Sequence, residues 1–142
     1  MARAPTSSRA KRSAPVIWPL RSAREGVDTR TLRGAVGHVP GSALPGQPGN
    51  AAFAAHRDTF FRPLAGIRRN DIIKFSTADA EFEYVVRELK VVKPTELTVL
   101  DPTPSATLTL ITCFPFDYVG PAPNRFIVKA ERRLPPAPQP EA

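Results

Sequence analysis

The chain of 142 residues is long enough for one domain with a modest hydrophobic core, and its 17 prolines and eight glycines disfavour long helices. A single cysteine excludes an intrachain disulfide and a zinc site built from several cysteines. The net charge of +7 is concentrated at one end, because residues 1–24 hold six basic residues and no acidic one, while the other 118 residues hold 14 basic and 13 acidic ones, a balance that argues against a nucleic-acid-binding domain.

The two ends of the chain are expected to be disordered. Residues 1–24 predict a basic, solvated leader, although such a tail could also contact phosphates or anionic lipid. The apolar stretch at residues 14–20 is short, is interrupted by prolines and lacks a signal-peptide cleavage site. The sequence contains no run of eighteen apolar residues, so we expect no membrane-spanning helix. Residues 134–142 contain four prolines and predict a disordered tail, which leaves 25–133 as the folded domain.

Between these ends the pattern is typical of a β protein. Helix signals are weak and short, at residues 28–35 and 58–64. Residues 77–81 predict a hairpin turn, and residues 101–105 predict a proline-stiffened loop. Strands are predicted from β-branched and aromatic residues and from alternation, at residues 71–77, 82–92, 95–101, 107–113 and 125–130. Several short strands with few helices indicate a barrel or a sandwich.

The cysteine stands at the end of the strand predicted at residues 107–113. Alternation places Cys113 on the face opposite to Leu108 and Leu110. If this strand pairs antiparallel with the one at 125–130, Cys113 and Arg125 lie opposite each other, with Cα atoms roughly 4.5–5.5 Å apart. A guanidinium group beside a thiol can stabilise a thiolate or donate hydrogen bonds to an oxyanion.

A catalytic thiol also needs a proton partner, and the sequence contains two histidines. His56 follows an apolar run at the end of a predicted element, whereas His38 lies among turn-forming residues. Each candidate also has a structural interpretation: Cys113 as a buried inert residue, Arg125 as a surface residue, and either histidine as a hydrogen-bonded structural group. Residue types and spacing alone favour the structural interpretation.

A wider similarity changes this balance. Residues 109–113, TLITC, resemble the sortase signature, in which the cysteine ends a strand. Residues 54–64, AAHRDTFFRPL, are similar to the histidine segment of that family, and residues 40–50 resemble the loop before it. Residues 113–128 are similar throughout to the segment from the cysteine to the arginine. The resemblance covers roughly residues 25–131, and the HRDTFF and TCFPF forms are most similar to the class D type.

The sortase resemblance implies an all-β fold, a closed β-barrel of about seven to eight strands with one or two short helices. It implies that Cys113 is the nucleophile, that His56 is the general acid and base, and that Arg125 stabilises an oxyanion or positions the substrate backbone. Thr112 and Ala55, which flank the cysteine and the histidine, are implied substrate-binding residues. The implied chemistry uses no metal and no other cofactor.

The implied activity is that of a cysteine transpeptidase. It would cleave an LPxTG-like sorting signal of a secreted protein through a thioester acyl-enzyme and transfer the product to an amine, from a cell-wall peptide or a pilin lysine. The implied location is the extracytoplasmic face of the plasma membrane or the cell envelope. No nucleic-acid partner is expected, and loops 93–95 and 101–105 are expected to set the sorting-signal preference.

Three features depart from the family pattern. The sequence predicts no N-terminal membrane anchor, which sortases usually carry. Residues 13–27 supply the first strand poorly, with residues 16–18 as its remnant. Ala55 stands where the family commonly has glycine, and a methyl group there is expected to crowd the site or alter the backbone. The alternatives are therefore an inactive, N-terminally truncated sortase-like barrel that acts as a binding or assembly module, and a basic nucleic-acid-binding barrel.

Overall fold

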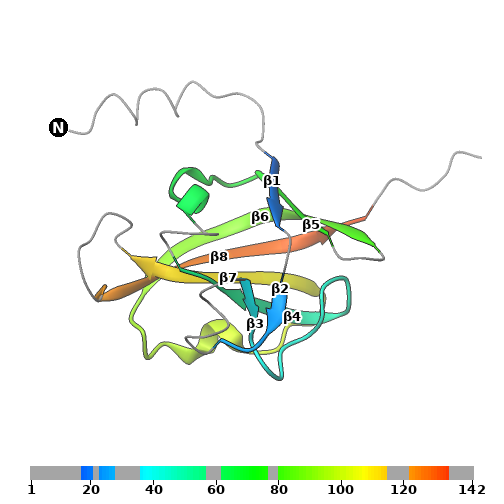
Figure 1. Ribbon diagram of the computed structural model, residues 1–142. Coiled ribbons are helices and arrows are strands. Elements are labelled where there is room, and N and C mark those ends of the chain that lie inside the picture. Colours follow the sequence, from blue (N-terminus) through cyan, green and yellow to red (C-terminus); the bar gives the residue numbers. More distant parts are fainter. Residues whose placement is uncertain are drawn as a thin grey trace, which may run out of the picture.

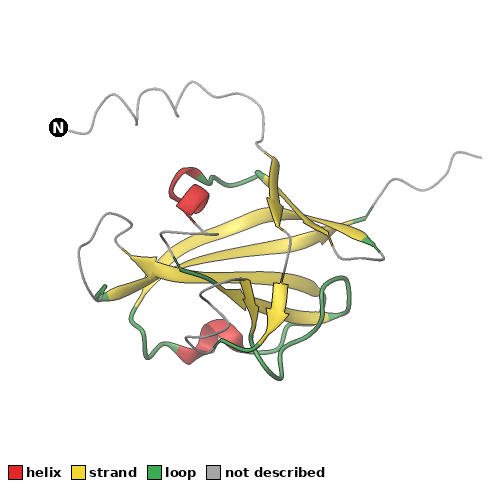
Figure 2. Ribbon diagram, in the orientation of Figure 1, coloured by secondary structure: helices red, strands yellow, loops and turns green. Residues whose placement is uncertain are grey.

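The computed structural model describes residues 17–20, 23–27, 36–56, 62–76, 80–114 and 122–134. These residues form strands and two short 3₁₀ helices (Figure 2). The strands are β1 (Ile17–Leu20), β2 (Ala23–Glu25), β3 (Val36–His38), β4 (Gly49–Ala54), β5 (Ile72–Ser76), β6 (Glu81–Val92), β7 (Ala106–Phe114) and β8 (Asn124–Arg133). The 3₁₀ helices are η1 (Arg62–Gly66) and η2 (Leu97–Leu100).

The strands form one curled sheet in the order β1-β5-β6-β8-β7-β4-β3-β2 (Figure 1). The long strands β6, β8 and β7 are antiparallel neighbours in its centre, and β4 runs parallel to β7. The strands predicted at residues 71–77, 82–92, 107–113 and 125–130 are therefore confirmed as β5, β6, β7 and β8. The predicted all-β class is likewise confirmed.

Both edges of the sheet come from one short segment of the chain. β1 pairs parallel with β5, with Ile17 opposite Ile72, and β2 pairs parallel with β3, with Glu25 opposite His38. Two residues separate β1 from β2, so consecutive parts of the chain lie on opposite edges of the curled sheet (Figure 1). Among the described residues β1 and β2 do not pair with each other. The sheet is therefore curled, but backbone hydrogen bonds do not close it into the barrel predicted from the resemblance.

The N-terminal boundary predicted from sequence needs correction. Residues 17–20 and 23–24 belong to strands, although the sequence assigned residues 1–24 to a disordered leader. The segment 13–27, expected to supply the first strand poorly with residues 16–18 as its remnant, contains the two short strands β1 and β2. β1 contains Pro19, and proline cannot donate to a β ladder. It is tolerated in β1 since this edge strand pairs on one side only.

The strand predicted at residues 95–101 is wrong. This segment contains η2, with tight backbone bonds from the Asp101 N–H to the Thr98 carbonyl (3.1 Å) and from the Glu96 N–H to the Lys93 carbonyl (3.0 Å). The neighbouring strands β6 and β7 already pair on both sides, so the sheet offers no free edge there. The predicted loop at 101–105 is confirmed.

The helix signals have a mixed outcome. Residues 28–35 lie outside the described part of the chain. Of the segment 58–64, only its last residues are described, and they form the start of η1. The hairpin between β5 and β6 pairs Ser76 with Glu81, as the predicted turn requires, although most of the turn itself is not described.

The hydrophobic core lies on the concave face of the sheet. Its largest fully buried side chains include Tyr84, Phe53 and Phe75, and Leu64 and Ile67 from the η1 region cover one side. β7 contributes Leu108 and Leu110 to this cluster. Because side chains alternate along a strand, Thr109 and Cys113 of β7 lie on the opposite face, here called the outer face.

Candidate active site

Cys113 and Arg125 lie directly opposite each other at one end of the sheet. The antiparallel register of β7 and β8 pairs these two residues, which confirms the register predicted from sequence. Both side chains are partly buried. The Arg125 guanidinium donates hydrogen bonds to the backbone carbonyls of Asn124 (2.9 Å) and Ala122 (3.3 Å), and these bonds restrain it beside the start of β8. The arginine that is paired with the only cysteine of the chain is thus held in place by its own backbone neighbours.

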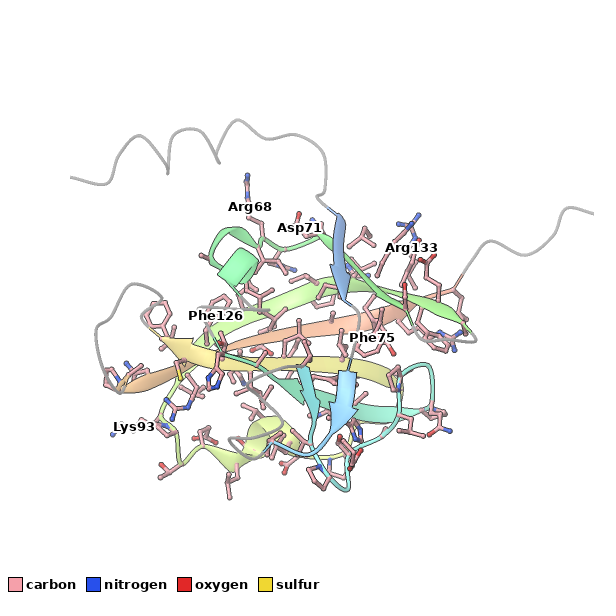
Figure 3. The ribbon with its side chains drawn as sticks, in the orientation of Figure 1. Arg68, Asp71, Phe75, Lys93, Phe126 and Arg133 are labelled. Carbon is pink, nitrogen blue, oxygen red and sulfur yellow. The ribbon has the colours of Figure 1, made fainter. Side chains whose placement is uncertain are left out.

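His56 reaches the same end of the sheet from β4. The last pair in the parallel β4·β7 ladder is Ala54 with Ile111, and the Ala55 N–H continues it by donating to the Ile111 carbonyl at 3.3 Å. Ala54 is paired with Ile111, and two residues further along each strand stand His56 and Cys113. Continuation of this register therefore places His56 level with Cys113. His56 is exposed to solvent. Adjacent strands β4, β7 and β8 therefore bring the histidine, the cysteine and the arginine to one end of the sheet. Phe126, the neighbour of Arg125, marks this end in Figure 3, and Arg133 marks the other.

Thr112 and Ala55 are both buried, with 2% and 5% of their surfaces exposed. The Thr112 hydroxyl donates to the Ala55 carbonyl at 2.9 Å, so it ties the segment before His56 to the strand that ends near Cys113. Ala55 belongs to the hydrophobic core, and Asn70 is the only non-glycine residue with positive φ in the described part of the chain. The methyl group of Ala55 is therefore accommodated without the left-handed backbone that would require glycine.

His38 lies elsewhere and has a structural role. Its Nδ1 is 2.6 Å from the Glu25 carboxylate, and its Nε2 lies 2.8 Å from the Ala43 carbonyl and 2.9 Å from the Ser42 hydroxyl. This arrangement of serine, histidine and carboxylate resembles a hydrolase triad. However, the Ala43 carbonyl can only accept, so Nε2 carries a proton and is not a base for Ser42. The cluster instead ties β2 to β3 and to the loop that follows.

The described residues contain no group of three or more His, Cys, Asp and Glu side chains arranged to hold a metal ion. Within the same residues, no helix is long and apolar enough to cross a membrane. A cavity of about 340 Å³ lies at the far end of the sheet, between the loop before β4, the start of β7 and the end of β8. It is lined by residues such as Gly46, Ala106 and Arg132, and it is separate from Cys113.

Sequence reasoning missed a polar network on the outer face. Asn50, Thr109 and Lys129 come from β4, β7 and β8, and their side chains meet under η2. The alternation of TLTLITC places Thr109 on the same face as Cys113, but nothing local in the sequence links it to Asn50, 59 residues away.

An all-β fold with cysteine, histidine and arginine at one end of a curled sheet is the arrangement implied by the sortase resemblance. The sortase domain model matches residues 8–133. Sortase D of Bacillus subtilis is 33% identical over 109 residues, which cover 76% of this chain and 55% of that protein. Sortase A of Listeria monocytogenes is 34% identical over 87 residues, which cover 58% of this chain and 38% of that protein. The chain belongs to the sortase family, and it spans about half the length, or less, of these two relatives.

Solved structures agree with this assignment. The Sortase D5 transpeptidase of Clostridium perfringens is 30% identical with a TM-score of 0.70, over 78% of this chain and 69% of that one. A lid mutant of Sortase A from Corynebacterium diphtheriae is 31% identical with a TM-score of 0.72, over 81% and 64% of the two chains. Class D, the type predicted from sequence, is the type of the Bacillus relative.

Proposed function

We propose that this protein is a cysteine transpeptidase that acts on an LPxTG-like sorting signal, with Cys113 as nucleophile, His56 as general acid and base, and Arg125 as oxyanion donor or substrate-positioning group. The observation that carries the proposal is the pairing of β4, β7 and β8. It puts Cys113 opposite Arg125, and it brings the chain after Ala54 to the same end of the sheet.

The proposed reaction has two steps. The Cys113 thiolate attacks the scissile carbonyl of the sorting signal, a C–S bond forms, and the C–N bond breaks as His56 gives a proton to the leaving amine. An incoming amine then attacks the thioester, His56 takes its proton, and the C–S bond breaks to release the thiolate. The guanidinium of Arg125 faces negative charge on the carbonyl oxygen in both steps, where charge stabilisation is most effective. This chemistry requires no metal or other cofactor.

The proposed partners are secreted proteins with a C-terminal sorting signal and an amine acceptor on a cell-wall peptide or a pilin lysine. The proposed location is the extracytoplasmic face of the plasma membrane or the cell envelope. We further propose that β1 and β2 act together as one strand that completes a closed barrel, because each half already pairs with a different edge of the sheet.

The test is incubation of the protein with an LPxTG-type peptide and a primary amine. Mass spectrometry should detect an acyl adduct on Cys113 and an amide product. The adduct should be absent in Cys113→Ala, and Arg125→Ala should lower kcat by roughly a hundredfold or more through the loss of an oxyanion donor. Arg87→Ala is the matched control, because Arg87 is an exposed arginine of β6 paired with Glu131, and it should leave the rate unchanged.

Two results would reject the enzyme proposal. One is a folded wild-type protein that gives neither adduct nor amide across a panel of peptides. The other is full activity in Cys113→Ala. Peptide binding without turnover would then favour the alternative, a binding or assembly module.

A further inference from the structure

A closed ring of hydrogen bonds on the outer face joins three strands to one loop. Lys129 Nζ donates to the Val99 carbonyl (2.7 Å) and to the Thr109 hydroxyl (2.9 Å). The Thr109 hydroxyl donates to Asn50 Oδ1 (2.5 Å). Asn50 Nδ2 donates to the same Val99 carbonyl (2.9 Å), which closes the ring. We call Asn50, Thr109 and Lys129 the loop anchor.

The loop anchor holds η2 against the sheet. Asn50 Nδ2 also donates to the Asp101 carbonyl at 3.0 Å, so both the end of η2 and the residue after it are fixed. Val99 itself is 4% exposed, whereas Leu97 on the same short helix is 68% exposed. The polar side chains therefore bind the backbone of the C-terminal half of η2, while the beginning of the helix faces solvent.

The loop anchor and Cys113 share the outer face of the sheet. Thr109 and Lys129 are paired in the β7·β8 ladder, and Cys113 and Arg125 form the pair four residues further along the same strands. Four residues of a strand span about 13 Å, which is the length of a short extended peptide. In Figure 3, Lys93 marks where the chain leaves β6 to form the loop that carries η2.

Partial burial of the charged Lys129 side chain is energetically unfavourable. Burial is the largest cause that lowers the pKa of its ammonium group, and the nearby charge of Lys90 lowers it further, whereas Glu88 and Asp101 act in the opposite direction. Its ammonium group donates to two neutral acceptors, the Val99 carbonyl and the Thr109 hydroxyl. A half-buried cation that binds a loop carbonyl points to a requirement for that loop to stay in one place.

We infer that the loop anchor is a positioning device that holds η2 as a wall for the extended peptide whose scissile carbonyl lies at Cys113. This inference rests on the proposed function. Lys129 is thus a positioning residue, which acts through the backbone of Val99 and does not touch the reacting atoms.

The first test measures the loop itself. Lys129→Met keeps the length and apolar stem of the side chain but removes its donors. In hydrogen exchange followed by mass spectrometry, peptides covering residues 96–101 should exchange roughly tenfold faster or more, as expected for the loss of a charged hydrogen bond. Lys74→Met is the matched control, because Lys74 lies on β5 and its ion pairs are with Glu81 and Glu83. It should leave the exchange of this loop unchanged.

The second test measures peptide binding without turnover. In a Cys113→Ala background, Lys129→Met should weaken the affinity for an LPxTG-type peptide by roughly tenfold. In the presence of Cys113, KM should rise while kcat and the rate of Cys113 alkylation by iodoacetamide stay unchanged. Val86→Ala, a core variant that lowers stability without touching the loop, should leave KM unchanged, which separates positioning from general destabilisation.

The outcomes distinguish the two proposals. Unchanged loop exchange, unchanged peptide affinity or no peptide binding at all would overturn the inference. A wild-type protein that binds the peptide without turnover, with weaker binding in Lys129→Met, would reject the transpeptidase proposal and support the inference.

Discussion

At the scale of single residues, Tyr84 shows how one buried side chain fixes a loop. Its ring is fully buried in the core, and its hydroxyl accepts a hydrogen bond from the Gly46 N–H at 2.7 Å. Arg132 donates to the carbonyl of the same glycine at 2.8 Å and lies over the Phe82 ring. Gly46 is therefore held from both sides of its backbone, and burial raises the pKa of the Tyr84 hydroxyl above its ordinary value.

This pKa shift predicts a pH dependence of stability. Because the folded-state pKa is raised, Tyr84 stabilises the fold fully below its unfolded-state pKa of about 10 and loses that contribution as pH rises through the folded value. Tyr84→Phe should cost about 1 kcal/mol at neutral pH, since the Gly46 N–H loses its partner. It should also weaken the decline above pH 10, measured by urea denaturation across pH. An identical alkaline decline in both proteins would contradict the assignment.

At the scale of elements, the loop between β3 and β4 depends on glycine at two positions. Gly41 and Gly46 both adopt positive φ, of +85° and +84°, which side-chain-bearing residues rarely adopt. Their surroundings differ. A Cβ atom on Gly41 would meet no atom within 4 Å, whereas one on Gly46 would overlap the Phe82 ring. Of these two glycines, therefore, only Gly46 lies so close to β6 that a side chain would not fit.

The two glycines give a matched pair of substitutions. Gly41→Ala should cost about 1 kcal/mol of unfolding free energy, from the left-handed backbone alone. Gly46→Ala should cost roughly 1–3 kcal/mol more, because the methyl group must also displace Phe82. Chemical denaturation measures both values. Equal losses in the two variants would show that the Phe82 ring moves aside without a cost in unfolding free energy.

At the scale of the whole molecule, the stretch from β1 to β2 secures both edges of the curled sheet. β1 covers β5, whose Ile73 and Phe75 are fully buried, and β2 covers β3 at the other edge. The hydrogen bond between His38 Nδ1 and the Glu25 carboxylate (2.6 Å) supports the second of these pairings. An uncovered β5 would present a row of unpaired backbone groups to other chains.

Removal of β1 should therefore affect both stability and association. Deletion of residues 1–22 should lower the unfolding free energy by on the order of 2 kcal/mol, through the loss of the β1·β5 ladder. It should also promote self-association, measured by sedimentation velocity, because the edge of β5 becomes free. Deletion of residues 1–10 retains β1 and serves as the control. A monomer of unchanged stability after the longer deletion would show that β1 does not protect the edge.

Part of the fold and of the candidate site was predictable because it depends on local pattern. Alternation in TLTLITC placed Leu108 and Leu110 in the core and Cys113 on the other face, and the pairing of Cys113 with Arg125 followed from one antiparallel connection. The same reasoning failed at residues 95–101, because local strand propensity does not show whether a sheet still has a free edge.

By itself, the sequence determined the all-β class, the central strands and the residue opposite the cysteine, since period-two alternation and neighbouring strands act over short separations. Only the tertiary structure decided that β1 and β2 cover the two edges of the sheet. It also decided that His38 links β3 to β2 through Glu25, and that Asn50, Thr109 and Lys129 meet at Val99. These contacts join residues brought together by the curl of the sheet. Their partners are set by cross-strand packing and hydrogen bonding, which no local periodicity encodes.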